Sequence, residues 1–144
     1  PMDTPARGRH EMSTQPTSPV AGQGLSPITA ALQSTLNDTG ADEGLCTLFI
    51  QHTSASLLIQ ESYDESARHD LERWLNRLVP ENDPLYTQTL EGADDMPAHI
   101  KAALPATQLS IPFRDSTLLL GQWQGIYLWE HRHQSANRRI VVHL

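Results

Sequence analysis

Apolar runs of strand length dominate this sequence, and only one long segment has helical periodicity. The runs lie at residues 44–51, 55–60, 108–113, 117–120, 125–130 and 139–144, and each is typical of a buried or half-buried strand. Between Tyr63 and Leu78 apolar residues recur on one helical face, and Pro80 ends that pattern. The absence of a regular alternation of strands and helices argues against a doubly wound parallel sheet. We expect an α+β fold with an antiparallel sheet toward the C-terminus.

Further elements are expected on both sides of this core pattern. Ser26 and Pro27 resemble an N-cap followed by proline at the first helical position, which predicts a helix that ends before Gly40. A short helix is expected over residues 96–104. Residues 1–24 are interpreted as a separate N-terminal segment, partly a tag or an edge strand. Residues 25–144 are expected to form one domain, because 144 residues suffice for one hydrophobic core.

Charge and cysteine content narrow the function classes. The formal net charge of −7 argues against a nucleic-acid partner, and no apolar stretch is long enough to suggest a membrane partner. Cys46 is the single cysteine and lies in an apolar run, which favours a buried, inert thiol over a disulfide. No signal-peptide pattern is visible, so a cytoplasmic protein is expected.

The chain has seven histidines, and two of them stand out. His52 lies where an apolar strand ends, a position suited equally to function and to a simple hydrogen bond. His99 follows Asp95 by four residues at a loop-to-helix transition, which is a plausible ligand or acid–base arrangement. Alternatively, Asp94 or Asp95 only caps the helix.

Other polar residues offer weaker signals. His131 and His133 have the spacing of a metal-binding pair on a strand, but a polar hairpin turn is slightly favoured. Glu61 ends a strand, and Asp70 lies near the edge of the apolar face of the long helix. A helix cap explains Asp64.

Imidazole and carboxylate groups without thiolate suit Zn²⁺ or another divalent metal at an open catalytic site. Ser54 and Ser56 lie near His52, but no motif marks either one as an activated nucleophile. Lys101, Arg138 and Arg139 are candidate phosphate contacts, although a solvated surface role is the default for each. Trp123 lies between two glycines and is either a core residue or a wall of a ligand pocket.

Three segments together resemble hallmark stretches of the YjbQ-like proteins (UPF0047). The first is His-Thr-Ser-Ala-Ser-Leu at residues 52–57, continued by Glu61, Asp64, Arg68 and Asp70. The second is residues 91–101, and the third is residues 121–126, which include Trp-Gln-Gly. This chain has Gln60 where the family more usually has Asn, and Gln122 where Thr is common. Neither difference changes an ionisable group.

The resemblance implies a compact α+β subunit with antiparallel sheets in a sandwich, assembled as a homotrimer. It also implies a metal-bearing pocket that holds His52, Glu61, Asp70, Asp95 and His99, with Trp123 and Gln124 nearby. The family is commonly labelled a secondary thiamine-phosphate synthase on the basis of a weak activity.

The leading hypothesis is therefore a metal-assisted enzyme that joins a pyrimidine diphosphate to a thiazole phosphate. His52 and His99 would hold a divalent metal, Zn or Mg, while Glu61, Asp70 or Asp95 would complete its shell or act as acid or base. Lys101 and Arg139 would contact phosphate, with Trp123 and Gln124 beside the substrate. A metal-dependent hydrolase and a non-catalytic metal- or ligand-binding trimer are the alternatives.

Overall fold

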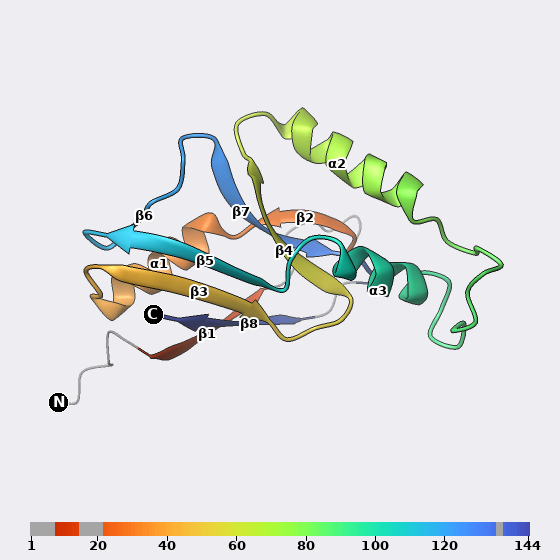
Figure 1. Ribbon diagram of the computed structural model, residues 1–144, viewed down its shortest axis with the longest axis horizontal. Coiled ribbons are helices and arrows are strands. Elements are labelled where there is room, and N and C mark those ends of the chain that lie inside the picture. The colour runs from red at the N-terminus through yellow and green to blue at the C-terminus, as the bar shows by residue number, and fades with distance from the viewer. Residues whose placement is uncertain (1–7, 15–21, 135–136) are drawn as a thin grey trace.

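Two antiparallel sheets and three helices make up the structure, a computed structural model that describes residues 8–14, 22–134 and 137–144. The strands are β1 (Arg9–Thr14), β2 (Gly24–Pro27), β3 (Gly44–Ile50), β4 (Ala55–Glu61), β5 (Gln108–Arg114), β6 (Thr117–Leu118), β7 (Gln124–Glu130) and β8 (Arg138–His143). The helices are α1 (Thr29–Thr39), α2 (Glu65–Leu78) and α3 (Asp95–Ala103). This confirms the predicted α+β class with antiparallel sheets (Figure 1).

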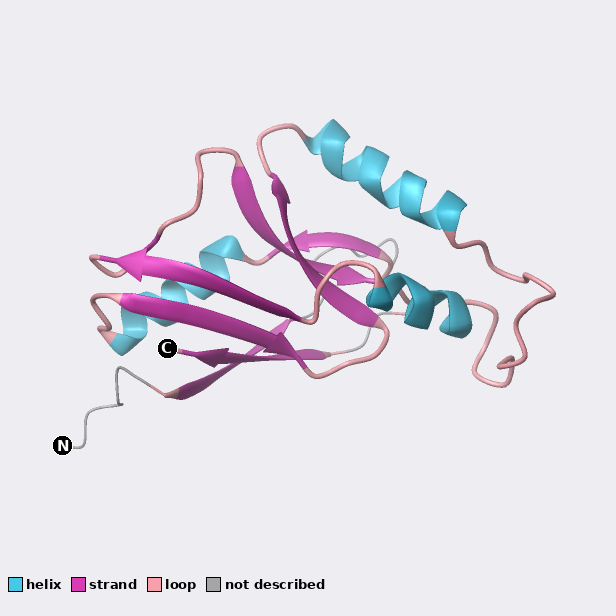
Figure 2. Ribbon diagram, viewed as in Figure 1, coloured by secondary structure: helices cyan, strands magenta, loops and turns pink. Residues whose placement is uncertain are grey.

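The two sheets pack face to face around the main core. One sheet has the order β1-β8-β3-β5-β6 and the other the order β2-β7-β4 (Figure 2). Alternate residues of β3, β7 and β8 point into the space between them, among them Leu48, Leu128 and Ile140, and Leu32 of α1 joins this core. These four side chains are fully buried. The alternation along β3 and β8 therefore places their apolar residues in this core.

A second, smaller core covers the other face of the three-stranded sheet. Tyr127 and Trp129 of β7 pack there against Leu75 of α2 and Ile100 of α3. Because both of its faces are covered, β7 is buried at every position from Gly125 to Glu130. A strand covered on both faces needs apolar residues at successive positions rather than at alternate ones.

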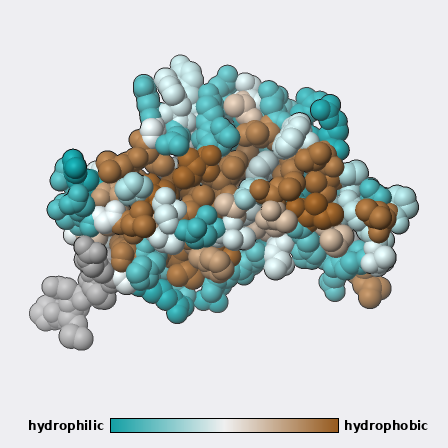
Figure 3. Space-filling model, in the orientation of Figure 1, coloured by the Kyte–Doolittle hydropathy of each residue, from teal (hydrophilic) through white to brown (hydrophobic). Residues whose placement is uncertain are grey.

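The outer face of the five-stranded sheet carries no helix among the described residues. Leu45 and Phe49 of β3 point outward there and are about half exposed, at 52% and 48%. The space-filling view shows apolar side chains gathered across the middle of the molecule (Figure 3). No described helix is long and apolar enough to span a membrane.

Two expectations for local structure need correction or refinement. The helix predicted to begin at Ser26 and Pro27 begins at Thr29, because residues 24–27 form the edge strand β2 instead. Proline is tolerated on an edge strand, where its missing N–H breaks no ladder hydrogen bond.

The N-terminal segment contributes β1, which pairs with β8 as an edge strand. Asp64 caps α2 as expected, because its carboxylate accepts a hydrogen bond from the Ser66 amide at 2.9 Å.

Candidate functional site

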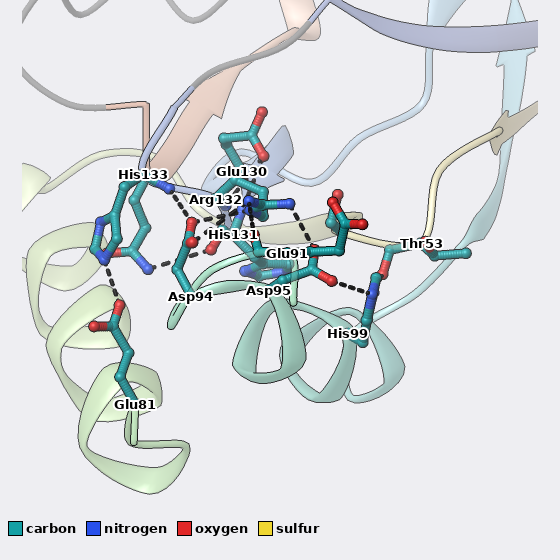
Figure 4. Close-up of polar contacts among 12 residues, drawn as sticks. Thr53, Glu81, Glu91, Asp94, Asp95, His99, Glu130, His131, Arg132 and His133 are labelled. Carbon is teal, nitrogen blue, oxygen red and sulfur yellow. Dashed lines mark hydrogen bonds and ion pairs between the residues drawn. The ribbon is translucent and has the colours of Figure 1, made fainter. Parts of the chain in front are cut away.

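The turn between β3 and β4, residues 52–54, is the meeting point of three parts of the chain. His52 belongs to the turn itself. His99 of α3 donates from Nδ1 to the carbonyl oxygen of Thr53 at 2.9 Å (Figure 4). Arg138 of β8 donates from Nη2 to Ser54 Oγ at 3.0 Å and lies 3.3 Å from its carbonyl oxygen. The two histidines singled out in the sequence thus both meet this turn, His52 as part of it and His99 through the Thr53 carbonyl oxygen.

His99 and Asp95 form a close pair one turn apart on α3. His99 Nε2 lies 3.0 Å from Asp95 Oδ2, and Asp95 is only 4% exposed. A hydrogen bond from Gln88, opposed by burial and reinforced by the charges of His99 and Arg132, holds the pKa of the Asp95 carboxyl below its usual range. Both ring nitrogens of His99 face acceptor oxygens, so the two hydrogen bonds form together only when both nitrogens carry protons.

Arg132 holds this acidic segment in place from the turn after β7. Its guanidinium donates to Asp94 Oδ2 at 2.9 Å, to Asp95 Oδ1 at 2.6 Å and to the Glu91 carbonyl oxygen at 3.0 Å (Figure 4). The His133 amide adds a hydrogen bond to Asp94 Oδ2 at 2.9 Å. Asp94 occupies the N-cap position of α3 but makes no side-chain capping bond. The carboxylates therefore bind the turn after β7, which the capping interpretation did not include.

A buried ion pair lies on the other side of the 52–54 turn. Arg138 Nε donates to Glu130 Oε1 at 2.8 Å, and Arg138 Nη2 contacts Glu130 Oε2. Glu130 Oε2 also accepts from the amides of His131 and Arg132, at 3.1 and 3.3 Å. Glu130 is fully buried and Arg138 is 4% exposed. Every oxygen of the carboxylate is thus satisfied, as a buried charge requires.

His52 lies against β8 and contacts donors on both sides of its ring. Its Nε2 accepts from the Arg139 amide at 2.8 Å, and its Nδ1 lies 3.3 Å from Nη1 of Arg138. Burial, followed by the positive charge of Arg138, lowers the pKa of His52. Both effects favour the neutral ring in the protein at neutral pH.

A cavity of about 570 Å³ opens beside this ring. It is lined by residues 49–54 together with Thr107 and Arg138. This volume falls within the range of small-molecule sites in proteins. Two hydroxyl-bearing side chains of the turn, an imidazole and a guanidinium face the cavity, and Phe49 supplies an apolar wall.

Three of the predicted site residues lie at the opposite end of β4. Ala55 pairs with Glu130 near the 52–54 turn, whereas Glu61 pairs with Gln124 six residues later, about 20 Å along the strand. Trp123 packs edge-on against Tyr63 with ring centroids 4.8 Å apart, and Gln124 accepts a hydrogen bond from the Gly121 amide at 2.7 Å. Within one chain, Glu61, Trp123 and Gln124 are therefore not brought to His52 and His99.

The remaining predicted residues occupy three different settings. Asp70 lies on α2 in a separate hollow lined also by Arg73, Trp74 and Arg77. Arg139 is exposed and its side chain reaches Glu11 at 3.4 Å, while its amide binds His52. Lys101 departs from the surface position that was the default for it. It is 3% exposed, and its Nζ donates to Asn76 Oδ1 at 2.6 Å. Burial lowers the pKa of this amine.

His131 and Ser56 form a buried pair that the sequence did not mark as such. His131 Nε2 lies 2.9 Å from Ser56 Oγ, and both residues are at most 1% exposed. Burial, with smaller contributions from Lys101 and Arg138, lowers the pKa of His131 to about 3. This pair is closed to solvent, and its hydrogen bond joins β4 to the turn after β7. His133 points elsewhere, toward Glu81, so the two histidines of this turn do not converge (Figure 4).

The metal prediction rests on fewer ligands than a complete site. Among the described residues no group of three or more His, Cys, Asp or Glu side chains is placed to hold an ion. Asp95 and His99 remain as a pair of potential ligands. Arg132 and Glu130 were missed as site residues, and Arg138 was considered only as a candidate phosphate contact with a surface position as its default. Alternation places Glu130 in line with Ile126 and Leu128, and Arg138 in line with Ile140. A charged residue at an inward-facing strand position was the sequence signal that could have identified these residues.

Comparison with known proteins relates this chain to a family. The family model described as "UPF0047 protein YjbQ-like" matches residues 14–144. The UPF0047 protein sll1880 of Synechocystis is 44% identical over 123 residues, covering 85% of this chain and 84% of that protein. The UPF0047 protein YjbQ of Escherichia coli O157:H7 is 48% identical over 101 residues, covering 70% of this chain and 72% of that protein.

Solved structures show the same fold. An uncharacterised YjbQ/UPF0047 protein of Clostridium acetobutylicum superposes with a TM-score of 0.80 at 28% identity, over 94% of this chain and 99% of that one. A conserved hypothetical protein of Thermus thermophilus gives a TM-score of 0.77 at 29% identity, over 92% of this chain and 99% of that one. The chain therefore belongs to the YjbQ-like family of UPF0047 proteins.

Proposed function

We propose that this protein is a metal-assisted enzyme acting on a phosphorylated small molecule, with Asp95 and His99 as its metal ligands. The observation that carries the proposal is the orientation of His99. Its Nδ1 donates to the Thr53 carbonyl oxygen, which leaves Nε2 directed at the Asp95 carboxylate. Metal-binding histidines commonly donate their second ring nitrogen to a backbone carbonyl in this way.

The donor set fits a divalent cation that also takes oxygen ligands from a substrate. Mg²⁺ is commonly held by one or two protein ligands together with phosphate oxygens and water. Zn²⁺ would need a further protein ligand or a substrate atom. His52 would have to release the Arg139 amide before its Nε2 lone pair could bind a metal. Bound there, the ion would supply Lewis-acid stabilisation of negative charge on a phosphoryl group.

The chain's own residues would bind and orient the substrate. Arg138 and His52 offer N–H groups to an anion in the cavity, and the Glu130 ion pair keeps the guanidinium in a fixed orientation. The Thr53 carbonyl oxygen holds the ring of His99 in place through Nδ1. Transfer between a pyrimidine diphosphate and a thiazole phosphate, with loss of pyrophosphate, is the first reaction to test. A metal-dependent hydrolase would use the same groups on a different substrate.

A homotrimer would explain why the predicted site is divided between the two ends of β4. Tyr63 and Trp123 are large aromatic residues that are 76% and 50% exposed at the far end. Contact between copies would bury them and could bring Glu61 and Gln124 of one copy to His99 of the next. A non-catalytic binding trimer remains the alternative from another functional class. The single cysteine, Cys46, is a buried free thiol, which is compatible with the proposed cytoplasmic location.

Elemental analysis of untagged protein tests the metal proposal directly. We expect a bound divalent metal in the wild type and a loss of at least about tenfold in affinity in the variants His99→Ala and Asp95→Asn. The exposed His69 on α2 provides a matched control, and His69→Ala should retain the metal. Thiamine phosphate formation from purified substrates should follow the same order. Equal metal content in wild type and His99→Ala would refute the ligand assignment, and equal activity would refute the synthase.

A further inference from the structure

We propose that the Nδ1–H of His52 and the guanidinium of Arg138 form a cradle for the phosphoryl group of the substrate. The inference deepens the proposed function and rests on it for the identity of the whole substrate. What it adds is the anion-binding part of the site, which consists of two donors 3.3 Å apart at the wall of the cavity.

The first step is the tautomer of His52. A backbone amide can only donate, so the 2.8 Å contact from the Arg139 amide requires a lone pair on Nε2. The proton of a neutral ring then resides on Nδ1. Arg138 Nη1, which also can only donate, lies against this same nitrogen. The two groups are therefore both donors, and one acceptor within hydrogen-bond distance of both nitrogens would satisfy both.

The second step is the fixed position of Arg138. Its Nε and Nη2 groups are engaged by the Glu130 carboxylate and by Ser54. The contact with His52 is the one contact of Nη1 among the described residues. Because Glu130 and the 52–54 turn hold the other side of the guanidinium, Nη1 is pre-organised to donate into the cavity. Such pre-organisation lowers the entropic cost of binding a ligand.

The third step is the chemistry of the cavity wall. Thr53, Ser54 and Thr107 place hydroxyl-bearing residues beside the two N–H donors, and the lining contains no carboxylate side chain. A phosphoryl group offers several oxygens to such a set, and guanidinium groups bind phosphate oxygens strongly. A carboxylate offers only two oxygens and would satisfy fewer donors.

Binding of inorganic phosphate and pyrophosphate, measured by calorimetry in the presence of EDTA, tests the cradle without any metal. We expect wild-type protein to bind phosphate with a Kd in the millimolar range or tighter, and at least about tenfold tighter than acetate. His52→Ala should weaken phosphate binding by about tenfold or more, because one charge-assisted donor is lost. Arg138→Lys keeps the positive charge but loses the planar, multiple N–H donors of the guanidinium, and it should weaken phosphate binding by a similar factor.

Two control variants separate the cradle from general surface charge. Arg114→Ala removes an exposed cation elsewhere on the same sheet, and His143→Ala removes an exposed histidine from the same strand as Arg138. Both should stay within about threefold of wild type, since exposed charges contribute little. If Arg138→Lys fails to fold, His52→Ala decides the question.

Nitrogen-15 NMR of the imidazole tests the geometric premise separately. We expect the Nδ1–H tautomer of His52 in the ligand-free protein at neutral pH. An Nε2–H tautomer, equal affinity for acetate and phosphate, or unchanged phosphate binding in His52→Ala would each overturn the cradle. Because EDTA is present throughout, loss of the cradle and failure of the metal-assisted function are distinguishable.

Discussion

His131 shows how one buried side chain can make the stability of this protein depend on pH. The ring is 1% exposed, and its Nδ1 has no hydrogen-bond partner among the described residues. Burial favours the neutral form and lowers the pKa of His131 to about 3, against an ordinary value of 6.5. Between these two pH values the unfolded chain binds a proton that the folded chain does not, so stability must fall as the pH is lowered.

We expect this histidine alone to remove about 2 kcal/mol from the free energy of unfolding between pH 7 and pH 5. Urea denaturation of the wild type and of His131→Gln at both pH values measures it. The variant can still hydrogen-bond Ser56, and although it will be less stable at pH 7, its pH dependence should be smaller by about that amount. His69→Gln, at an exposed position on α2, should keep the full pH dependence. An unchanged slope in His131→Gln would contradict the prediction.

At the scale of elements, the turn after β7 governs the position of the acidic segment before α3. Arg132 makes its contacts across nearly forty residues of sequence, to Asp94, Asp95 and the Glu91 carbonyl. Asp95 Oδ1 is held by Arg132, so Oδ2 is left to face His99. The Arg132 guanidinium thereby positions Asp95 and His99, although Arg132 lies outside α3.

Arg132→Ala should loosen residues 91–95 and weaken metal binding by about 10- to 100-fold, the usual effect of removing a group that orients a ligand. Hydrogen exchange of residues 91–95 and metal titration measure the two effects. Arg132→Lys, which can reach one carboxylate but cannot fork between two, should be intermediate. Arg114, in an exposed pair with Glu43, serves as a control, and Arg114→Ala should change neither quantity. Tight metal binding in Arg132→Ala would show that Asp95 keeps its orientation unaided.

Local patterns predicted most of these elements because each pattern has a local cause. The period of two along β3 and β8, the cap at Asp64 and the break at Pro80 depend on neighbouring residues alone. The spacing of Asp95 and His99 on one helix face likewise predicted their contact. Pro27 was assigned to a helix because proline is favoured in the first turn of a helix. Proline is also tolerated on an edge strand, and only the pairing of Pro27 with Tyr127 distinguishes the two positions.

Long-range placement explains what the sequence did not predict about the site. Burial of Lys101 depends on α2 lying beside α3, where Asn76 meets its amine. Glu130 and Arg138 lie in different sheets, so their ion pair follows only from the packing of one sheet on the other. Sequence periodicity indicates at most that a charged residue faces inward and not which partner it meets, because each contact joins segments whose relative position is set by tertiary structure.

For the whole molecule, the central question is how the two ends of β4 cooperate. In one chain the 52–54 turn and the Glu61 end are separated by the length of a seven-residue strand, about 20 Å. A side chain cannot span that distance. If Glu61 acts on the same substrate as His99, as the resemblance implied, the two must come from different copies in the proposed homotrimer.

Mixing two inactive variants tests this sharing. His99→Ala and Glu61→Gln each remove a different half of the proposed site, so either homotrimer should lose activity. In trimers reassembled from an equal mixture, a site is intact only when its His99 half comes from one variant and its Glu61 half from the other. Random assembly gives this combination at about one quarter of the sites, and about one quarter of wild-type activity should return. Mixing His99→Ala with Asp95→Asn, whose changes fall in the same half, should restore none. No restoration in the first mixture would place the complete site within a single chain, and restoration in the control would contradict the pairing of Asp95 and His99 within one chain.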